Sequence, residues 1–200
     1  MLQEAFAAWG TPVTWLELVA FTMALAMVFL NMRVHPAAWP LAIGSSLLYA
    51  WLFEASKLYG EAGLQIVFAL LGAWGWWQWL RGTQDGGAPL RVRTLARPTA
   101  FGAALAFALL WPGIALLLAG LTDSPVPWWD ALATAGSLVG QWLLGRKYVE
   151  NWPTWVAVNA VSVVLFASRG LVLTTLLYAL FLVLSFVGWR AWRRLAAAPA

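Results

Sequence analysis

The segments RVHPAAWP (residues 33–40) and RKYVENWP (residues 146–153) share an arginine and a Trp-Pro pair at identical positions. Identical residues continue outward in the same alignment, among them Pro12 and Pro125, Trp15 and Trp128, Gly75-Trp76 and Gly188-Trp189, Trp79 and Trp192, and Arg81 and Arg194. Leucine and alanine matches are expected by chance in an apolar chain, but matched tryptophans, prolines and arginines are not. We therefore predict that residues 12–81 and 125–194 are two copies of one structural unit, aligned without a gap, with chance similarity as the alternative.

The composition places both copies in a membrane. Hydrophobic residues make up 62% of the 200 residues and charged residues only 10%, whereas globular proteins average about 45–50% apolar and about 25% charged residues. A soluble chain of this length cannot bury so much apolar surface, and a disordered chain would be polar. We predict an integral membrane protein. Because the chain has no cysteine, disulfides, thiolate metal sites and cysteine nucleophiles are excluded.

Charges and helix breakers divide the chain into apolar stretches, and a membrane helix needs about 20 such residues. The expected spans are 13–32, 38–53, 62–80, 99–120, 127–144, 152–168 and 170–189. The predicted fold is all-α, with seven transmembrane helices in a 3+1+3 order. It comprises a first three-helix bundle (1–81), a cytoplasmic linker with a linking helix (82–124) and a second three-helix bundle (125–200). An even number of helices separates equivalent helices, so both bundles insert with the same polarity, as parallel repeats.

Basic residues predict the orientation of the spans. If the loops alternate sides, only Lys57 and Arg169 lie on the side of the N-terminus. The opposite side holds the other basic residues: Arg33, Arg81, Arg91, Arg93, Arg97, Arg146, Lys147, Arg190, Arg193 and Arg194. Since Lys and Arg concentrate in cytoplasmic loops, we expect an inner-membrane protein with its N-terminus outside and its C-terminus cytoplasmic. The net charge of +4 then reflects topology and not a nucleic-acid partner.

The sixth predicted span begins with NWPTWVAVNAVS (151–162) and contains the strongest candidate site. Trp152, Trp155, Asn159 and Ser162 recur at helical spacing, which places them along one face. Two indoles can stack on a flat aromatic ligand, with further attraction if the ring is cationic, and the Asn159 amide can both donate and accept hydrogen bonds. Interfacial anchoring of Trp152 and interhelical hydrogen bonding by Asn159 are the structural alternatives.

Three further residues extend the predicted binding site. Ser46 aligns with Asn159 in the repeat, and Gln65 aligns with Tyr178. We expect Gln65 to hydrogen-bond the ligand and include Ser46 and Tyr178 as contacts.

Other conspicuous residues have structural interpretations. The GSLVG segment (136–140) predicts close helix packing through its two glycines, and Gln141 beside it is expected to be a structural amide. Glu17 and Asp130 are expected near the outer ends of their spans, either solvated or attracting cations. The tryptophans that end the third and seventh spans are predicted to be interfacial anchors, with gating as the alternative: Trp74, Trp76, Trp77, Trp79, Trp189 and Trp192.

The residue types that catalysis and coupling require are missing from the middle of the spans. No Lys, Arg, Asp or Glu is expected at mid-depth, and the single histidine, His35, lies in a loop. A phosphorylated substrate would lack a cationic partner, and a proton relay would lack members. The sequence contains no HExxH or GxSxG motif. We therefore predict a passive transporter that is not an enzyme and uses no cofactor and no metal.

Four segments together resemble the Pnu-type vitamin transporters over nearly the whole chain, and most closely the PnuC-type nicotinamide riboside transporters. These segments are LYGEAGLQ (58–65), GWWQWLR (75–81), NWPTWVAVN (151–159) and SRGLVLTTLLYALFLVLSFVGWRAW (168–192). The resemblance implies seven-span 3+1+3 homotrimers related to the SWEET sugar transporters. It also implies that Trp152, Trp155 and Asn159 form the substrate motif WxxWxxxN and that Gln65 is the family's glutamine. The loop NMRVHPAAWP (31–40) departs from the family's more compact NWP, which points to a smaller role for the first bundle.

The resemblance implies uptake of nicotinamide riboside, a vitamin B3 precursor of NAD, by facilitated diffusion with alternating access across a lipid bilayer. This ligand suits the site, because it offers a cationic ring to the indoles and a carboxamide and hydroxyls to the amides. Thiamine or another aromatic vitamin or nucleoside on the same fold is the first alternative. A non-transporting membrane scaffold or receptor, with the amides joining helices, is the second.

Overall fold

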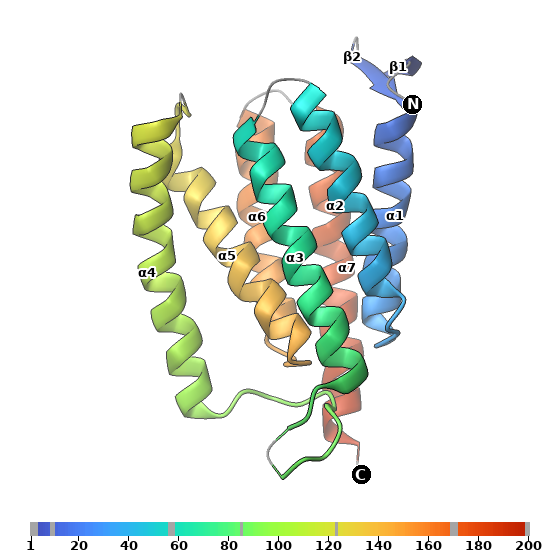
Figure 1. Cartoon of the computed structure of the whole chain (residues 1–200), viewed down its shortest axis with the longest axis vertical. Coiled ribbons are helices and arrows are strands. Elements are labelled where there is room, and N and C mark those ends of the chain that lie inside the picture. The colour runs from blue at the N-terminus through green and yellow to red at the C-terminus, as the bar shows by residue number, and fades with distance from the viewer. Residues whose placement is uncertain are drawn as a thin grey trace. The chain divides into compact units, whose positions relative to one another are not determined.

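The computed structural model describes residues 4–8, 11–55, 59–84, 86–122, 124–168 and 172–198. A short antiparallel hairpin of β1 (Glu4–Ala8) and β2 (Thr11–Thr14) precedes the helices. The described helices are α1 (Trp15–Met32), α2 (Ala38–Ala55), α3 (Tyr59–Arg81), α4 (Arg97–Leu121), α5 (Pro127–Gly145), α6 (Asn151–Ser168) and α7 (Val172–Ala197) (Figure 1). Each corresponds to one predicted span.

Two features differ from the sequence prediction. Helix α7 continues to Ala197, beyond the expected end at 189, because Arg193 and Arg194 in its last turns are favourable near the negative end of the helix dipole. The sequence does not predict the hairpin, because EAFAA has no β-branched residue and TPVT contains a proline. Neither difference changes the order of the helices.

The chain divides into two compact units, residues 1–82 and 83–200. In the first unit α2 packs against both α1 and α3, and consecutive helices run in opposite directions (Figure 1). Leu16 and Ala20 of α1 and Trp39 of α2 are buried. The Ser45 hydroxyl of α2 donates a hydrogen bond of 3.0 Å to the Ala20 carbonyl, so a polar contact also joins these two helices.

In the second unit α4 packs against α5, α5 against α6, and α6 against α7. The Trp111 indole of α4 donates a hydrogen bond of 2.9 Å to the Trp128 carbonyl at the start of α5. A Cβ atom at Gly136 would lie 2.6 Å from a methyl of Val158 on α6. These contacts confirm the prediction that the GSLVG segment of α5 packs closely against another helix.

The α1–α2 loop and the α5–α6 loop have the same backbone conformation. Val34 and Lys147, which are equivalent in the sequence repeat, both adopt left-handed conformations with φ of 55° and 57°. Corresponding backbone hydrogen bonds close both loops: Val34 N–H to Asn31 O and Lys147 N–H to Leu144 O, each 3.0 Å, and His35 N–H to Leu30 O and Tyr148 N–H to Leu143 O, each 2.9 Å. The two loops therefore share a geometry although most of their residues differ.

A tryptophan lies on a glycine of the following helix in each unit. The Trp39 ring contacts the Gly75 backbone, the Trp152 ring contacts the Gly188 backbone, and a Cβ atom at either glycine would overlap the indole. Each indole also meets a second tryptophan edge to face: Trp39 with Trp79 at 5.4 Å and 87°, and Trp152 with Trp192 at 5.8 Å and 82°.

These contacts correct one sequence prediction. The sequence predicts Trp79 and Trp192 as interfacial anchors, but their exposed fractions are 7% and 0%. Trp79 is buried because it packs against Trp39, whose ring lies on Gly75. Trp192 is buried in the same way against Trp152, whose ring lies on Gly188. Trp76 and Trp77 are exposed, and interfacial anchoring stays a prediction for them.

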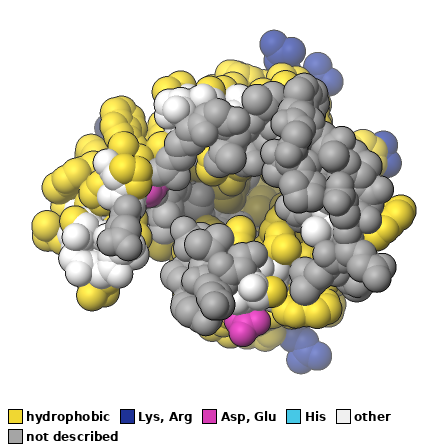
Figure 2. Space-filling model, turned by 90° about the horizontal axis from the view of Figure 1, so that it is seen from above, with side chains coloured by type: hydrophobic (Ala, Val, Ile, Leu, Met, Phe, Trp, Pro, Cys, Tyr) yellow, Lys and Arg dark blue, Asp and Glu magenta, His cyan; other side chains and the backbone are white. Residues whose placement is uncertain are grey.

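Apolar side chains cover much of the described surface, as Figure 2 shows from the end that carries the hairpin. Helix α4 illustrates this, because Ala115 is its buried hydrophobic residue while Phe101, Leu109 and Leu116 are each about two-thirds exposed or more. Among the described residues, α4 and residues 175–197 of α7 are long and apolar enough to cross a membrane by length and composition. Such surfaces suit a lipid environment, because lipid tails impose no penalty on exposed apolar side chains.

We predict that Gly75→Ala and Gly188→Ala each lower the free energy of unfolding by about 1–3 kcal/mol, the usual cost of overpacking. The added methyl would overlap the ring of Trp39 or Trp152, so a helix or an indole must move. The measurement is thermal unfolding of the purified protein in detergent. Gly102→Ala in α4 is the matched control, because no atom lies within 4 Å of its added Cβ. Equal stability of Gly188→Ala and Gly102→Ala would show that the indole contact does not constrain the unit.

Candidate binding site

The start of α6, where the candidate motif begins, is held by the linker that precedes α4. Arg93 pairs with the α5–α6 loop through two backbone hydrogen bonds, from its own N–H to the Lys147 carbonyl (3.1 Å) and from the Val149 N–H to its carbonyl (2.9 Å). Its guanidinium donates to the Tyr148 hydroxyl at 3.0 Å and lies 4.8 Å from the centre of that ring. The linker therefore acts as a strap across the loop that leads into α6.

Glu150 continues this attachment into the helix. Its carboxylate accepts a hydrogen bond of 3.0 Å from the Leu95 backbone N–H, and its carbonyl accepts a bond of 2.9 Å from the Thr154 hydroxyl. The side chain of Asn151, which is fully buried, donates to the Tyr148 carbonyl. The first turn of α6 is thus fixed from both the linker and its own loop.

The predicted stripe on α6 faces the interior of the second unit. Trp152, Asn159 and Ser162 are buried, with exposed fractions of 3%, 4% and 3%, and Trp155 is half-buried. A ring atom of Trp155 would lie 3.2 Å from a Cβ added at Gly140 of α5, so the absence of a side chain there makes room for this indole. The stripe is therefore not directed at lipid.

The stripe residues differ in their surroundings. Trp152 is committed to the contact with Gly188 and Trp192 described above, and its indole N–H has no hydrogen-bond partner in the described part of the chain. Trp155 keeps part of its surface exposed. Asn159 donates a hydrogen bond of 3.1 Å from Nδ2 to the Ser185 hydroxyl of α7. The structural alternative for Asn159 was a hydrogen bond between helices, and the structure contains such a bond. The bond to Ser185 uses one N–H group of the Asn159 amide.

The remaining predicted residues lie on other helices. Gln65 is half-buried on α3 and Ser46 is half-buried on α2, both in the first unit. Tyr178 is half-buried on α7 of the second unit, where its ring lies 5.0 Å from that of Phe166 and 6.0 Å from that of Phe181. The structure thus brings Trp155, Asn159 and Tyr178 into one unit, and it describes Gln65 and Ser46 separately in the other.

The structure describes Asp130 and Gln141, both on α5. Asp130 lies in the first turn of α5, is half-buried and accepts a hydrogen bond from the Ser124 hydroxyl. The side chain of Glu17 lies outside the described residues. Gln141 is buried on α5, in agreement with its interpretation as a structural amide.

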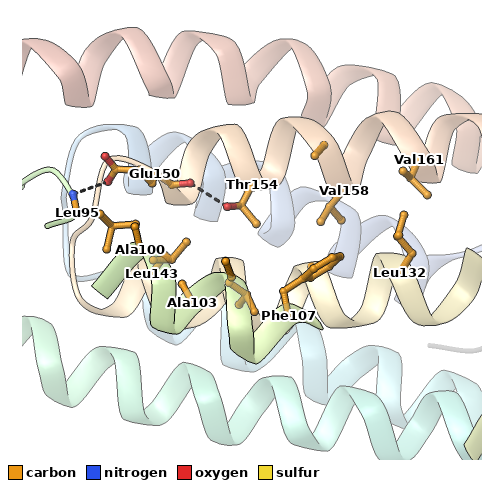
Figure 3. Close-up of a pocket in the computed structure, with 14 residues that line it drawn as sticks. Leu95, Ala100, Ala103, Phe107, Leu132, Leu143, Glu150, Thr154, Val158 and Val161 are labelled. Atoms are coloured by element: carbon orange, nitrogen blue, oxygen red, sulfur yellow. Dashed lines mark hydrogen bonds between the residues drawn. The ribbon is translucent and has the colours of Figure 1, made fainter. Parts of the chain in front are cut away.

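A separate crevice of about 430 Å³ lies between α4 and the α5–α6 pair. Figure 3 shows Ala100, Ala103 and Phe107 of α4 facing Thr154, Val158 and Val161 of α6 across it. Its lining is nearly all apolar and includes neither Trp155 nor Asn159. Helix α6 therefore presents one apolar face to this crevice and a different face, with the candidate motif, to α5 and α7.

Sequence reasoning missed two parts of the site. Ser185 lies within a long apolar run of α7, and its only signal is that it is a polar residue in a span, which predicts a helix–helix contact. The strap formed by Arg93 and Tyr148 was also missed, because topology alone explains an arginine in a cytoplasmic loop. Pairing between distant loops has no local signature in the sequence.

A sequence profile described as nicotinamide mononucleotide transporter matches residues 14–194. The nicotinamide riboside transporter PnuC of Escherichia coli is 27% identical over 209 residues, which cover 92% of this chain and 87% of that protein. The riboflavin/roseoflavin transporter RibM of Streptomyces davaonensis is 31% identical over 193 residues, which cover 94% of this chain and 89% of that protein. Both alignments extend over almost the full length of the chain.

The fold also matches a solved structure. The crystal structure of the vitamin B3 transporter PnuC superposes with a TM-score of 0.74 and 22% sequence identity, covering 91% of this chain and 82% of that chain. At this level of identity the match shows a shared fold, with the same helical architecture.

Lys147 in the α5–α6 loop is expected to make the free energy of unfolding change with pH in the alkaline range. Lys147 donates to the Leu90 carbonyl at 3.1 Å, and burial lowers its pKa below the ordinary value of 10.5. The folded protein thus binds this proton more weakly than the unfolded chain. As the pH rises from the lowered pKa towards 10.5, the folded state loses the proton first and the stability contribution of this group increases. Below that window both states are protonated and the burial penalty is complete.

We therefore predict that Lys147→Met abolishes part of the gain in stability that appears as the pH rises towards 10.5. The measurement is the midpoint of thermal unfolding across that range, relative to the native protein. Arg146→Met is the control, because it removes the neighbouring basic side chain of the same loop and leaves Lys147 in place. If Lys147→Met and the native protein had parallel profiles, the ammonium would not be coupled to folding.

Proposed function

We propose, from the premise that the chain belongs to the nicotinamide mononucleotide transporter family, that it carries nicotinamide riboside across a membrane by facilitated diffusion. The family contains vitamin transporters with different substrates, since one relative is named for nicotinamide riboside and another for riboflavin and roseoflavin. The substrate of this chain must therefore be argued from its own residues.

The observation that carries the proposal is the inward face of α6. A half-buried indole, Trp155, and a buried amide, Asn159, lie one turn apart on this face. A pyridinium ring can stack on the indole, with an attraction of about 0.5–2 kcal/mol from its positive charge. The carboxamide and ribose hydroxyls of the same ligand can exchange hydrogen bonds with Asn159, and we assign Gln65, Ser46 and Tyr178 as further contacts.

We assign different roles to the two indoles of the motif. Trp155 has exposed surface and is the stacking residue. Trp152 is held between Gly188 and Trp192, which suits a residue that fixes the inner end of the site beside the ligand. We give the stacking role to Trp155 because its side chain is less buried than that of Trp152.

The absence of fixed positive charge favours the riboside over its phosphorylated form. No Lys or Arg occurs in the middle of any predicted span, and the basic residues of the helices lie towards their ends, such as Arg81 of α3 and Arg194 of α7. A phosphate group buried at mid-depth would lack the arginine or lysine that normally pairs with it. The riboside has no such requirement.

The proposed architecture is a 3+1+3 arrangement of parallel repeats, with bundles 1–81 and 125–200 joined by 82–124. The matching loops around Val34 and Lys147 and the matching contacts of Trp39 and Trp152 support it. In proteins of this plan the substrate site lies between the bundles and access alternates by rocking of one against the other. We extend this mechanism to the chain, with the N-terminus outside, the C-terminus cytoplasmic and a homotrimeric assembly.

A second candidate substrate is a flavin. The relative with 31% identity is a riboflavin/roseoflavin transporter, and a flat flavin ring could also stack on Trp155. Parallel calorimetric titrations of the purified protein with nicotinamide riboside, thiamine and riboflavin separate the candidates. Tighter binding of riboflavin or thiamine than of nicotinamide riboside would replace the leading proposal.

We predict that Trp155→Ala weakens the binding of nicotinamide riboside by roughly 1–3 kcal/mol, the usual loss of one aromatic stacking contact. Isothermal titration calorimetry measures the change. Trp129→Ala is the matched control, because this tryptophan is on α5 of the same unit and is 58% exposed. Unchanged affinity in Trp155→Ala, with the control also unchanged, would remove Trp155 from the site.

We predict that radiolabelled nicotinamide riboside enters proteoliposomes down its own gradient and that an imposed proton gradient leaves the rate unchanged. The reason is that the helix interiors contain no carboxylate or histidine to relay a proton. Protein-free liposomes give the background flux. Stimulation by the proton gradient would contradict uncoupled transport, and flux no greater than background would contradict transport of this substrate.

A further inference from the structure

Ser185 of α7 is buried, with an exposed fraction of 3%, and forms two hydrogen bonds. Its hydroxyl donates to the Phe181 carbonyl of the same helix at 2.7 Å. The same oxygen accepts a bond from Nδ2 of Asn159 on α6 at 3.1 Å. Ser185 therefore links the candidate binding residue Asn159 to the backbone of α7.

The single hydroxyl proton determines the direction of these bonds. A serine hydroxyl has one proton and two acceptor lone pairs. Because the Phe181 carbonyl can only accept, it takes that proton, and the hydroxyl can then only accept from its other neighbour. An amide can donate only through its nitrogen, so the Asn159 nitrogen must face Ser185. The amide oxygen is then directed away from Ser185.

We propose that Ser185 is a positioning residue that fixes the orientation of the Asn159 amide, so that the site presents a hydrogen-bond acceptor and selects ligands with an N–H or O–H donor at that point. This inference rests on the proposed function, because it assumes that Asn159 contacts the ligand. A primary carboxamide is a donor of this kind. A carboxylate at the same place offers only acceptors and would face the Asn159 oxygen unfavourably.

The first unit lacks the elements of this device. In the sequence repeat Asn159 corresponds to Ser46, and Ser185 corresponds to Gly72, which has no hydroxyl. The space beside Gly72 is occupied by the Ile43 side chain, 2.9 Å from a Cβ built at the glycine. The second unit therefore has an amide oriented by a serine, Asn159 with Ser185. The equivalent residues of the first unit, Ser46 and Gly72, cannot form this pair.

The test compares two probes that differ only in the group to be recognised, nicotinamide riboside and nicotinic acid riboside. The affinity of each is measured by calorimetry for the native protein and for Ser185→Ala. Without the hydroxyl the amide can rotate and offer either its oxygen or its nitrogen. We expect the preference for nicotinamide riboside to fall about tenfold, as for the loss of one oriented hydrogen bond in a buried site, and Ser185→Thr to restore it.

A matched control removes a similar serine that lacks the interhelical bond. Ser137 of α5 donates to the Ala133 carbonyl at 2.8 Å, which is the same intrahelical bond that Ser185 makes, and Ser137→Ala should keep the native preference. If Ser185→Ala does not fold, Ser185→Cys replaces it, because a thiol of similar volume is only a weak acceptor and should shift the preference in the same direction.

Two outcomes would overturn the inference, and they are distinguishable. If the variant weakens both probes equally, Ser185 has a structural role alone, while the proposed function stands. If the native protein binds neither probe, the proposed function fails and this inference fails with it.

Discussion

The contact of an indole ring with a bare glycine backbone sets the packing in both units. Trp39 on Gly75 and Trp152 on Gly188 bring neighbouring helices closer than any side chain at the glycine would allow. In the second unit this contact fixes α6 against α7, which also places Asn159 within hydrogen-bond distance of Ser185. The orientation of the proposed ligand-binding amide of Asn159 thus depends on packing made by Trp152, two turns earlier on the same helix.

The start of α6, where Trp152 lies, is also held by chain segments outside the helices. The linker strap at Arg93 and the carboxylate of Glu150 hold the loop from which α6 begins. Packing against α7 and attachment to the linker therefore act on the same short helix. Such dual support suits a binding element, because a ligand contact loses affinity when its side chains must be ordered on binding.

The apolar stretches between charges and helix breakers were sufficient to predict the helices, since a long apolar run has few alternatives to a helix in a membrane. The internal repeat predicted two copies of one unit, and the matching loops around Val34 and Lys147 agree with it. The same reasoning misplaced Trp79 and Trp192 at the interface, because the sequence does not reveal that a glycine one turn earlier accommodates a second indole. Ser185 was missed for a related reason. Its role depends on a partner 26 residues away, and spacing within one helix carries no information about the neighbour it meets.

The paired indoles have an optical consequence. Among the sixteen tryptophans in the chain, three described pairs are nearly perpendicular: Trp39 with Trp79, Trp111 with Trp128 and Trp152 with Trp192, with ring centres 5.4 Å, 6.2 Å and 5.8 Å apart. Rings held at this distance in a fixed asymmetric arrangement couple their electronic transitions and contribute to the near-ultraviolet circular dichroism. Replacing Trp79 or Trp192 by phenylalanine would remove one pair at a time. The spectrum can therefore report the packing of each unit separately, without an added dye.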